Sequence, residues 1–363
     1  MPRHLASDRY LFGATLALVL FGVLMIFSAS AVVAESRFGS GYHFFARQLL
    51  WAAFGLLLLV GLMHLDYRRL CHPNIVFPAF FLQLALLIAA LVWPAGQSIR
   101  RWVSLGGFSL QPSEVSKIVL VIFLAYFLER RRGRVNHFLG TLLPVGLLSG
   151  LTILLILKGP DLGTAVLLGL TVCVMLFAAG LRVKYLGALV AASVVPFYFL
   201  VVMVPYRYDR ILTFLDPYQD PLGKGFQIIQ SLIAVGSGGF TGLGFMDGRQ
   251  KLFYLPAAYT DFIFAVVAEE LGFIGCLAAL GLFGVIFWRG LRASIKCRDE
   301  FGRLLALGLT AMIMIQTLVN ISVVLGLLPT KGVPLPFISY GGSSLMVSMA
   351  AMGILLNISQ HSD

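Results

Sequence analysis

Long apolar stretches separated by short polar loops make up most of this chain. An apolar run of 18 or more residues is long enough for a helix to cross a hydrocarbon core, which needs about 20 residues. Several such runs follow one another, so the pattern predicts an all-α membrane protein, a polytopic bundle of about ten transmembrane helices forming a single domain over residues 1–363. The predicted spans are 10–33, 44–64, 73–93, 114–130, 138–157, 161–181, 184–204, 262–288, 303–327 and 338–358.

Composition supports this prediction and narrows the function classes. Hydrophobic residues make up 59% of the chain and charged residues 12%, whereas about a quarter of a soluble domain is charged. The net charge of +11 comes largely from short basic clusters, such as Arg130–Arg132 and the cluster within 289–303. Cytoplasmic loops carry that pattern, so we expect no nucleic-acid partner. The four scattered cysteines provide neither a disulfide framework nor a metal knuckle.

The basic residues also predict the orientation of the helices. With the N-terminus inside, fifteen of the 27 Lys and Arg residues lie on the inner side, and only seven lie in the short outer loops. Short loops dominate orientation, so both termini are predicted to be cytoplasmic. The loop of about residues 205–260, between helices seven and eight, is then outside. Within it, 227–234 is predicted to be an amphipathic helical piece, which favours a functional loop over a disordered one.

Ionisable side chains gather towards the outer side of the predicted bundle. Such groups are costly at membrane depth, so each is a functional hypothesis by default. They lie at the starts of predicted spans, in the turns before them, or a few turns below: Glu114, Lys117, Lys158, Asp161, Asp261, Glu269, Glu270 and Lys331.

Asp261 is the sharpest of these candidates. Its structural interpretation is a carboxylate that caps the start of helix eight. Small residues share its helical face, so this face is either a close helix contact or one wall of a groove that admits a lipid chain. Glu269 lies on a neighbouring face and is expected to face the same cavity from below, whereas Glu270 is expected to pair within the bundle. The small residues are Ala265, Ala268, Gly272 and Ala279.

Three further features stand at the mouths of other spans. Glu114 and Lys117 are three residues apart, which allows a same-face ion pair; alternatively, Lys117 binds phosphate together with Arg101. Asp161 is placed to cap helix six. The turn-rich stretch 329–336, followed by 339–344, must be buried in protein or line a cavity. No Walker loop, Gly-x-Ser-x-Gly or His-Glu-x-x-His motif is present.

Taken in order, the motifs of this chain resemble those of the SEDS family of cell-shape and division proteins. The resemblance covers nearly the whole chain, and 329–332 with 341–344 are closer to the division branch than to the elongation branch. The motifs are Gln111-Pro112-Ser113-Glu114, Pro160-Asp161-Leu162-Gly163-Thr164, Asp216-Pro217, Asp220-Pro221-Leu222-Gly223-Lys224-Gly225-Phe226-Gln227, Lys251-Leu252-Phe253-Tyr254-Leu255-Pro256, Thr260-Asp261-Phe262-Ile263-Phe264-Ala265, Glu269-Glu270-Leu271-Gly272 and Ser339-Tyr340-Gly341-Gly342-Ser343.

This resemblance implies a peptidoglycan glycosyltransferase in the bacterial cytoplasmic (inner) membrane. It implies lipid II as substrate, membrane lipid around the chain, a class B penicillin-binding protein as partner, and other division or elongation membrane proteins. The family's catalytic aspartate matches Asp261, which is expected to act as general base. The family usually has Glu and His where this chain has Ala257 and Tyr259, so a role of those positions in holding a cation is in doubt.

The expected reaction joins a sugar hydroxyl to an anomeric carbon and expels a polyprenyl diphosphate. Lys117, Arg101 and Lys331 are candidates to bind that diphosphate, alone or with a divalent cation (Mg²⁺ or Mn²⁺) held partly by phosphate oxygens. The other expected substrate-binding residues are Glu114, Asp161, Glu269, Tyr340 and Ser343.

Two other functions fit a charged membrane bundle. A flippase for lipid II would need polar groups at mid-depth to pass the headgroup, whereas the charges here crowd the outer side. An inert scaffold for division partners would explain the helices but not the buried carboxylates. The asymmetry of the charges favours the polymerase.

Overall fold

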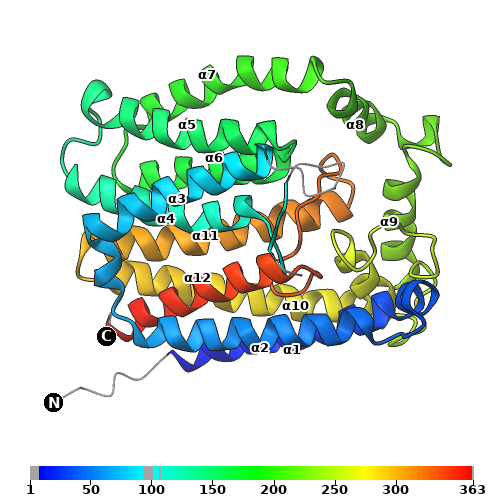
Figure 1. Ribbon diagram of the computed structural model, residues 1–363. Coiled ribbons are helices and arrows are strands. Elements are labelled where there is room, and N and C mark those ends of the chain that lie inside the picture. The colour runs from blue at the N-terminus through cyan, green and yellow to red at the C-terminus, as the bar shows by residue number, and fades with distance from the viewer. Residues whose placement is uncertain (1–7, 93–100, 106–107, 362–363) are drawn as a thin grey trace.

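The computed structural model describes residues 8–92, 101–105 and 108–361, and each predicted apolar segment contains one α-helix. These helices run roughly side by side along one direction (Figure 1). They are α1 (Arg9–Phe38), α2 (His43–His64), α3 (Pro73–Val92), α4 (Pro112–Arg130), α5 (Leu143–Lys158), α6 (Leu162–Ala178), α7 (Val183–Val202), α10 (Ile263–Lys296), α11 (Glu300–Val324) and α12 (Gly342–Gln360).

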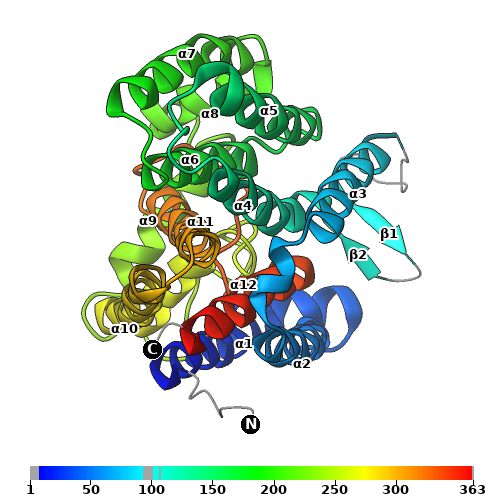
Figure 2. The same ribbon diagram turned by 90° about the vertical axis from the view of Figure 1, so that its left-hand side faces the viewer.

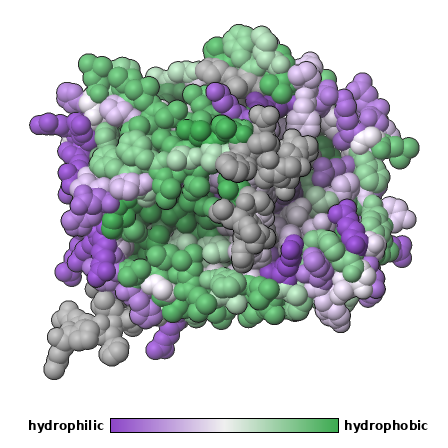
Figure 3. All heavy atoms as spheres, in the orientation of Figure 1, coloured by the Kyte–Doolittle hydropathy of each residue, from purple (hydrophilic) through white to green (hydrophobic). Residues whose placement is uncertain are grey.

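The prediction of an all-α, multi-pass membrane protein is confirmed. Among the described residues, seven helical segments are long and apolar enough to cross a membrane: α1, α2, α3, α10, α11, α12, and α5 together with the π-helical turn Phe138–Leu142 before it. α6 is apolar but shorter, and the count of ten spans stays a prediction. Hydrophobic residues cover the face between two hydrophilic ends of the molecule (Figure 3).

α12 lies at the centre of the bundle. It packs most extensively against α2 and also contacts α4, α10 and α11 (Figure 2). The contact with α2 is close, because a Cβ atom on Gly353 would lie 2.6 Å from the carbonyl oxygen of Leu59. α1 packs against α10, whereas α7 lies at the edge of the bundle beside α6.

The two ends of the bundle differ. One end holds the first turn of α1, the 3-10 turn Tyr67–Cys71 and the end of α12 (Figure 1). The other end, which we call the loop end, holds α8 (Pro205–Leu215), the 3-10 turn Pro217–Gln219, α9 (Phe226–Ser237) and the turns up to residue 262. α9 confirms the predicted helical piece 227–234, whereas α8 was not predicted.

A small hairpin also was not predicted. Within the predicted loop 94–113, β1 (Val103–Leu105) pairs antiparallel with β2 (Phe108–Leu110). Residues 93–100 and 106–107 of this region lie outside the described residues.

α10 is broken at Gly272, which has φ 63° and ψ −160°. The loop after α9 satisfies the backbone groups on both sides of the break: Leu243 N donates to Glu269 O, and Phe273 N donates to Gly239 O, both at 3.0 Å. Such a break is tolerated at membrane depth only where protein pairs the freed groups. The small residues below Asp261 are buried against neighbouring elements, so their face is a close contact and the lipid-groove interpretation is wrong.

Candidate active site

Asp261 lies in the turn that precedes α10, and its backbone is held on both sides. Tyr340 N donates to Tyr259 O at 3.0 Å, Ser339 Oγ to Thr260 O at 2.5 Å, and Asn320 Nδ2 to Asp261 O at 2.8 Å. Three successive carbonyl groups are therefore tied to α11 and to the segment before α12.

The capping interpretation of Asp261 is wrong. α10 begins after Phe262, which makes no side-chain cap, and within the described part of the chain no group donates a hydrogen bond to the Asp261 carboxylate. The carboxylate is partly exposed. It is therefore available for chemistry in a turn whose backbone is rigidly placed.

The pKa of Asp261 is raised to about 6, mainly by burial and also by the negative charge of Asp161, whereas the charges of Arg210 and Arg101 oppose this rise. A general base works best when its pKa lies near the operating pH. The same charges show that two cations and a second carboxylate lie close enough to act on Asp261.

The cations around Asp261 come from three separate segments. Arg101 Nε donates to Gly159 O at 2.8 Å, and its Nη2 donates to Pro160 O. Lys331, in the segment after α11, is partly buried, and this burial lowers the pKa of its ammonium group. Both had been predicted as diphosphate ligands, and the structure places both at the loop end.

α8 supplies two arginines that sequence reasoning missed. Arg210 Nη1 donates to Thr330 O at 2.7 Å, and Arg207 Nη2 donates to Leu157 O at 3.2 Å. Burial lowers the pKa of Arg207, and the charge of Arg101 lowers it further, so the two guanidinium groups lie in one cluster. The sequence signal that could have identified them is Pro205 followed by two arginines three residues apart, Arg207 and Arg210, at the start of a long loop. This signal is weak on its own.

Asp161 caps α6 as predicted. Its Oδ1 accepts from Thr164 N at 3.1 Å, and its Oδ2 accepts from Ser113 Oγ at 3.1 Å and Gln111 Nε2 at 3.2 Å. The carboxylate thus ties the starts of α4 and α6 together. A small cavity with about 250 Å³ of empty volume lies beside it, lined by Leu87, Ala90, Leu91, Arg101, Pro112, Ser113, Leu155, Ile156, Gly159 and Asp161.

Glu114 and Lys117 form the predicted ion pair, but inside the bundle. Lys117 Nζ lies 2.7 Å from Glu114 Oε2, and each side chain is 2% exposed. Lys117 also donates to Gln316 Oε1 at 2.6 Å. Because its ammonium group is enclosed and has two partners, this geometry favours the structural interpretation over phosphate binding.

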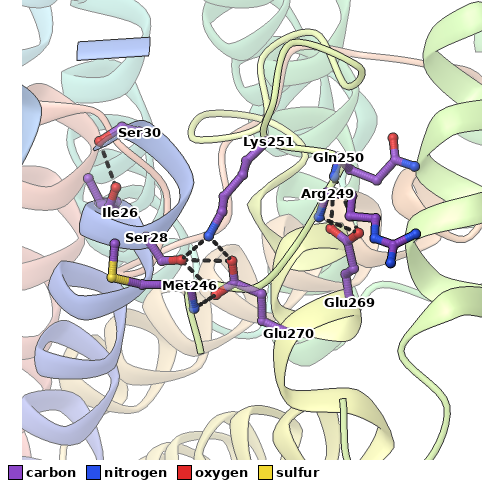
Figure 4. A network of polar contacts seen from close by, with 9 residues as sticks. All are labelled: Ile26, Ser28, Ser30, Met246, Arg249, Gln250, Lys251, Glu269 and Glu270. Carbon is purple, nitrogen blue, oxygen red and sulfur yellow. Dashed lines mark hydrogen bonds and ion pairs between the residues drawn. The ribbon is translucent and has the colours of Figure 1, made fainter. Parts of the chain in front are cut away.

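Glu269 and Glu270 both hold the loop that follows α9 (Figure 4). Glu269 Oε1 accepts from the backbone N–H of Arg249 at 2.8 Å. Glu270 pairs with Lys251 at 2.6 Å and accepts from Ser28 Oγ at 2.7 Å, so it pairs within the bundle as expected. Glu269 is 1% exposed and is directed to this loop rather than to a cavity with Asp261.

Tyr340 and Ser343 stand at the start of α12. The Tyr340 ring packs against Phe44 and Tyr259, with centroids 5.2 and 5.9 Å away. Ser343 is buried. Tyr340 therefore lies beside the turn that carries Asp261, whereas Ser343 lies within the bundle.

The donor set near Asp261 does not fit a cation held by the protein alone. Tyr259 packs its ring on Phe44 at 4.8 Å, Ala257 carries no ligand atom, and the Asp161 oxygens are occupied by hydrogen bonds. In residues 8–92, 101–105 and 108–361, no group of three His, Cys, Asp or Glu side chains is placed to hold a metal ion.

These features define a class: a helical, multi-pass membrane protein with a partly exposed aspartate near cations at one end. The family model described as cell cycle protein, covering FtsW, RodA and SpoVE, matches residues 8–363. The "Probable peptidoglycan glycosyltransferase FtsW" of Geobacter sulfurreducens is 45% identical over 345 residues, covering 94% of this chain and 92% of that protein. The stage V sporulation protein E of Bacillus subtilis is 43% identical over 359 residues, 98% of each chain.

Solved structures agree. A chain from a peptidoglycan synthase complex that coordinates polymerization and crosslinking superimposes with a TM-score of 0.80 at 34% identity, covering 99% of this chain and 100% of that one. The rod shape-determining protein RodA of Thermus thermophilus gives a TM-score of 0.73 at 30% identity, covering 99% of each chain. This chain belongs to the FtsW/RodA/SpoVE family, which is the SEDS family that its motifs resemble.

Proposed function

We propose that this protein is a peptidoglycan glycosyltransferase that polymerises lipid II at the outer face of the bacterial cytoplasmic membrane, with Asp261 as general base. The observation that carries the proposal is the Asp261 carboxylate, which caps no helix and has a raised pKa. Hydrogen bonds to three successive carbonyl groups hold its backbone, and cations from three segments lie around it. Membership of a family whose relatives are named peptidoglycan glycosyltransferases supports the same activity.

The reaction forms one bond and breaks one bond at the anomeric carbon. Asp261 accepts the proton of the attacking 4-hydroxyl group as its oxygen bonds to that carbon. The carbon–oxygen bond to the diphosphate breaks on the opposite face, and polyprenyl diphosphate leaves with the electron pair. Because the diphosphate leaves without protonation, one carboxylate suffices, unlike the pair that glycosidases use.

Cations at the loop end stabilise the charge that develops on the leaving diphosphate. Arg101, Arg210 and Lys331 are suited to this role, because each is partly exposed. Lys331 belongs to the segment that faces Asp261 and Arg210 bonds the residue before it, while the charge of Arg101 acts on the Asp261 carboxylate. Lys117 is enclosed within the bundle and is not assigned to the diphosphate. We derive no step through a divalent cation, since the nearby side chains do not provide its ligands.

The partner we propose is a class B penicillin-binding protein, because one similar chain comes from a peptidoglycan synthase complex. The FtsW relatives and the motif at 329–332 favour septal synthesis with other division proteins over elongation. A lipid II flippase is the alternative, but the cluster of Asp261, Arg210 and Lys331 lies at one end of the bundle rather than at mid-depth.

The direct test is to incubate the purified protein and its penicillin-binding partner with lipid II and to separate the glycan products. Long glycan strands that require Asp261 would support the proposal. Transfer of lipid II across a bilayer without polymer from the same preparation would favour the flippase.

A further inference from the structure

Asn320, on α11, connects the Asp261 turn to the segment before α12. Its Nδ2 donates to Asp261 O at 2.8 Å and also to Val333 O at 2.8 Å. We propose that Asn320 is the positioning residue that holds Asp261 against the 331–333 segment in the reactive geometry. This inference rests on the proposed function, in which Asp261 is the base.

The orientation of the Asn320 amide is determined by its partners. Both are carbonyl oxygens, which only accept, so the NH₂ group must face them. Oδ1 is then buried and has no hydrogen-bond partner among the described residues. An unsatisfied buried acceptor destabilises a fold. An apolar side chain would avoid that cost but would release both carbonyls, so Asn320 serves placement rather than stability.

A second amide, one turn earlier on α11, holds the same segment. Gln316 Nε2 donates to Pro334 O at 2.8 Å, while its Oε1 accepts from Lys117 Nζ at 2.6 Å. The buried Glu114–Lys117 pair thereby orients Gln316. Unlike Gln316, Asn320 also donates a hydrogen bond to the turn that carries Asp261.

A displacement of the Asp261 turn relative to the 331–333 segment would lower the rate of the reaction step. The 331–333 segment lines the carboxylate, since a Cβ atom on Gly332 would lie 3.2 Å from Asp261 Oδ2. A shift of about 1 Å in a reacting group can cost about 10²-fold in rate. Of the cations proposed for the diphosphate, Arg101 and Arg210 lie in other segments, and Lys331 acts on the charge that develops as the diphosphate leaves. Loss of Asn320 should therefore lower kcat and leave KM nearly unchanged.

The chain offers a matched control in Asn357 on α12. Like Asn320 it is 2% exposed, and its side chain bridges two backbone groups, with Nδ2 donating to Met63 O at 2.8 Å and Oδ1 accepting from Tyr67 N at 2.9 Å. It lies at the end opposite the site. Asn357→Ala should therefore cost at least as much stability as Asn320→Ala, without a specific effect on kcat.

The experiment compares Asn320→Ala and Asn357→Ala in lipid II polymerisation, in thermal unfolding and in hydrogen exchange. We expect Asn320→Ala to lower kcat about tenfold to a hundredfold with KM within about twofold, and to speed exchange in residues 259–263 and 331–336. In an Asp261→Asn background, which lacks the base, Asn320→Ala should lower kcat by less than about a further twofold.

Two results would overturn the inference: a kcat loss no larger than that of Asn357→Ala, or unchanged exchange in both segments. A full additional loss in the Asp261→Asn background would also overturn it. If Asp261→Asn instead polymerises at the wild-type rate, the proposed function fails, and the exchange data alone then decide whether Asn320 places the turn.

Discussion

Asp261 and Gly332 face each other so closely that a Cβ atom on Gly332 would lie 3.2 Å from Asp261 Oδ2. The two residues are 71 positions apart, and both α10 and α11 lie between them in the chain. At this point the carboxylate meets a residue without a side chain, in a segment that also includes Lys331.

Asp261→Asn should lower polymerisation at least about a hundredfold, because a general base commonly contributes about 10²–10⁴-fold. Folding should be unaffected, since the Asp261 side chain does not cap α10. The measurement is glycan yield from lipid II with the penicillin-binding partner. Asp209→Asn, an exposed aspartate at the same end, is the control and should be fully active. Equal activity of both variants would rule out the catalytic assignment.

The pH dependence of kcat follows from the pKa of Asp261, which is raised to about 6 mainly by burial. The base must be deprotonated, so activity should be half-maximal near pH 6 and should fall about tenfold for each pH unit below it. Arg210 lowers this pKa, so Arg210→Gln should move the acid limb to higher pH, whereas Arg210→Lys should not.

The control for that shift is Lys224→Gln, which removes an exposed cation of the loop end that pairs with Asp209. Its normalised pH profile should match the wild type. A profile that stays in place in Arg210→Gln would show that Arg210 does not act on Asp261.

The Glu114–Lys117 pair should contribute to stability through mutual neutralisation. Removing one partner of a buried pair typically costs about 3–5 kcal/mol, because it leaves an uncompensated charge. Lys117→Met alone should therefore lower the unfolding temperature more than Lys117→Met combined with Glu114→Gln, measured by thermal unfolding in detergent. A direct phosphate contact of Lys117 would instead appear as a raised KM for lipid II in the double variant.

Gly238→Ala should prevent the loop after α9 from docking on α10. A Cβ atom there would lie 1.8 Å from Ala268 O, a clash with backbone that no side-chain rotation relieves. We expect loss of folded protein in size-exclusion chromatography. Gly236→Ala, two residues earlier in α9 with nothing within 4 Å of the added atom, should be well folded. Normal folding of both would contradict the close approach.

The orientation of the bundle predicts that the loop end is periplasmic. A cysteine at Asp220 should react with an impermeant thiol reagent in intact cells, whereas one at Arg132, whose side chain is 79% exposed at the other end, should react only after the membrane is opened. Reaction of both from the same side would refute the orientation.

The local pattern of the sequence was sufficient to predict the helices and the capping role of one carboxylate, Asp161. Hydrophobic runs placed ten helices because an apolar stretch in lipid must satisfy its own backbone groups. The Asp161 cap was also readable, since a cap involves groups only three residues apart. The motifs around Asp261 marked it as the candidate base, although its local context suggested a cap.

Only the tertiary structure decided what surrounds Asp261, because those contacts join distant parts of the chain. Arg210 reaches Thr330 across 120 positions, and Asn320 reaches Asp261 across 59. The break at Gly272 could not be predicted from the continuous apolar run that contains it. Such a break is tolerated only where another part of the chain, here the loop after α9, pairs the freed backbone groups. The sequence by itself therefore determined the helices and the identity of the candidate base, whereas packing determined its charge, its placement and its neighbours.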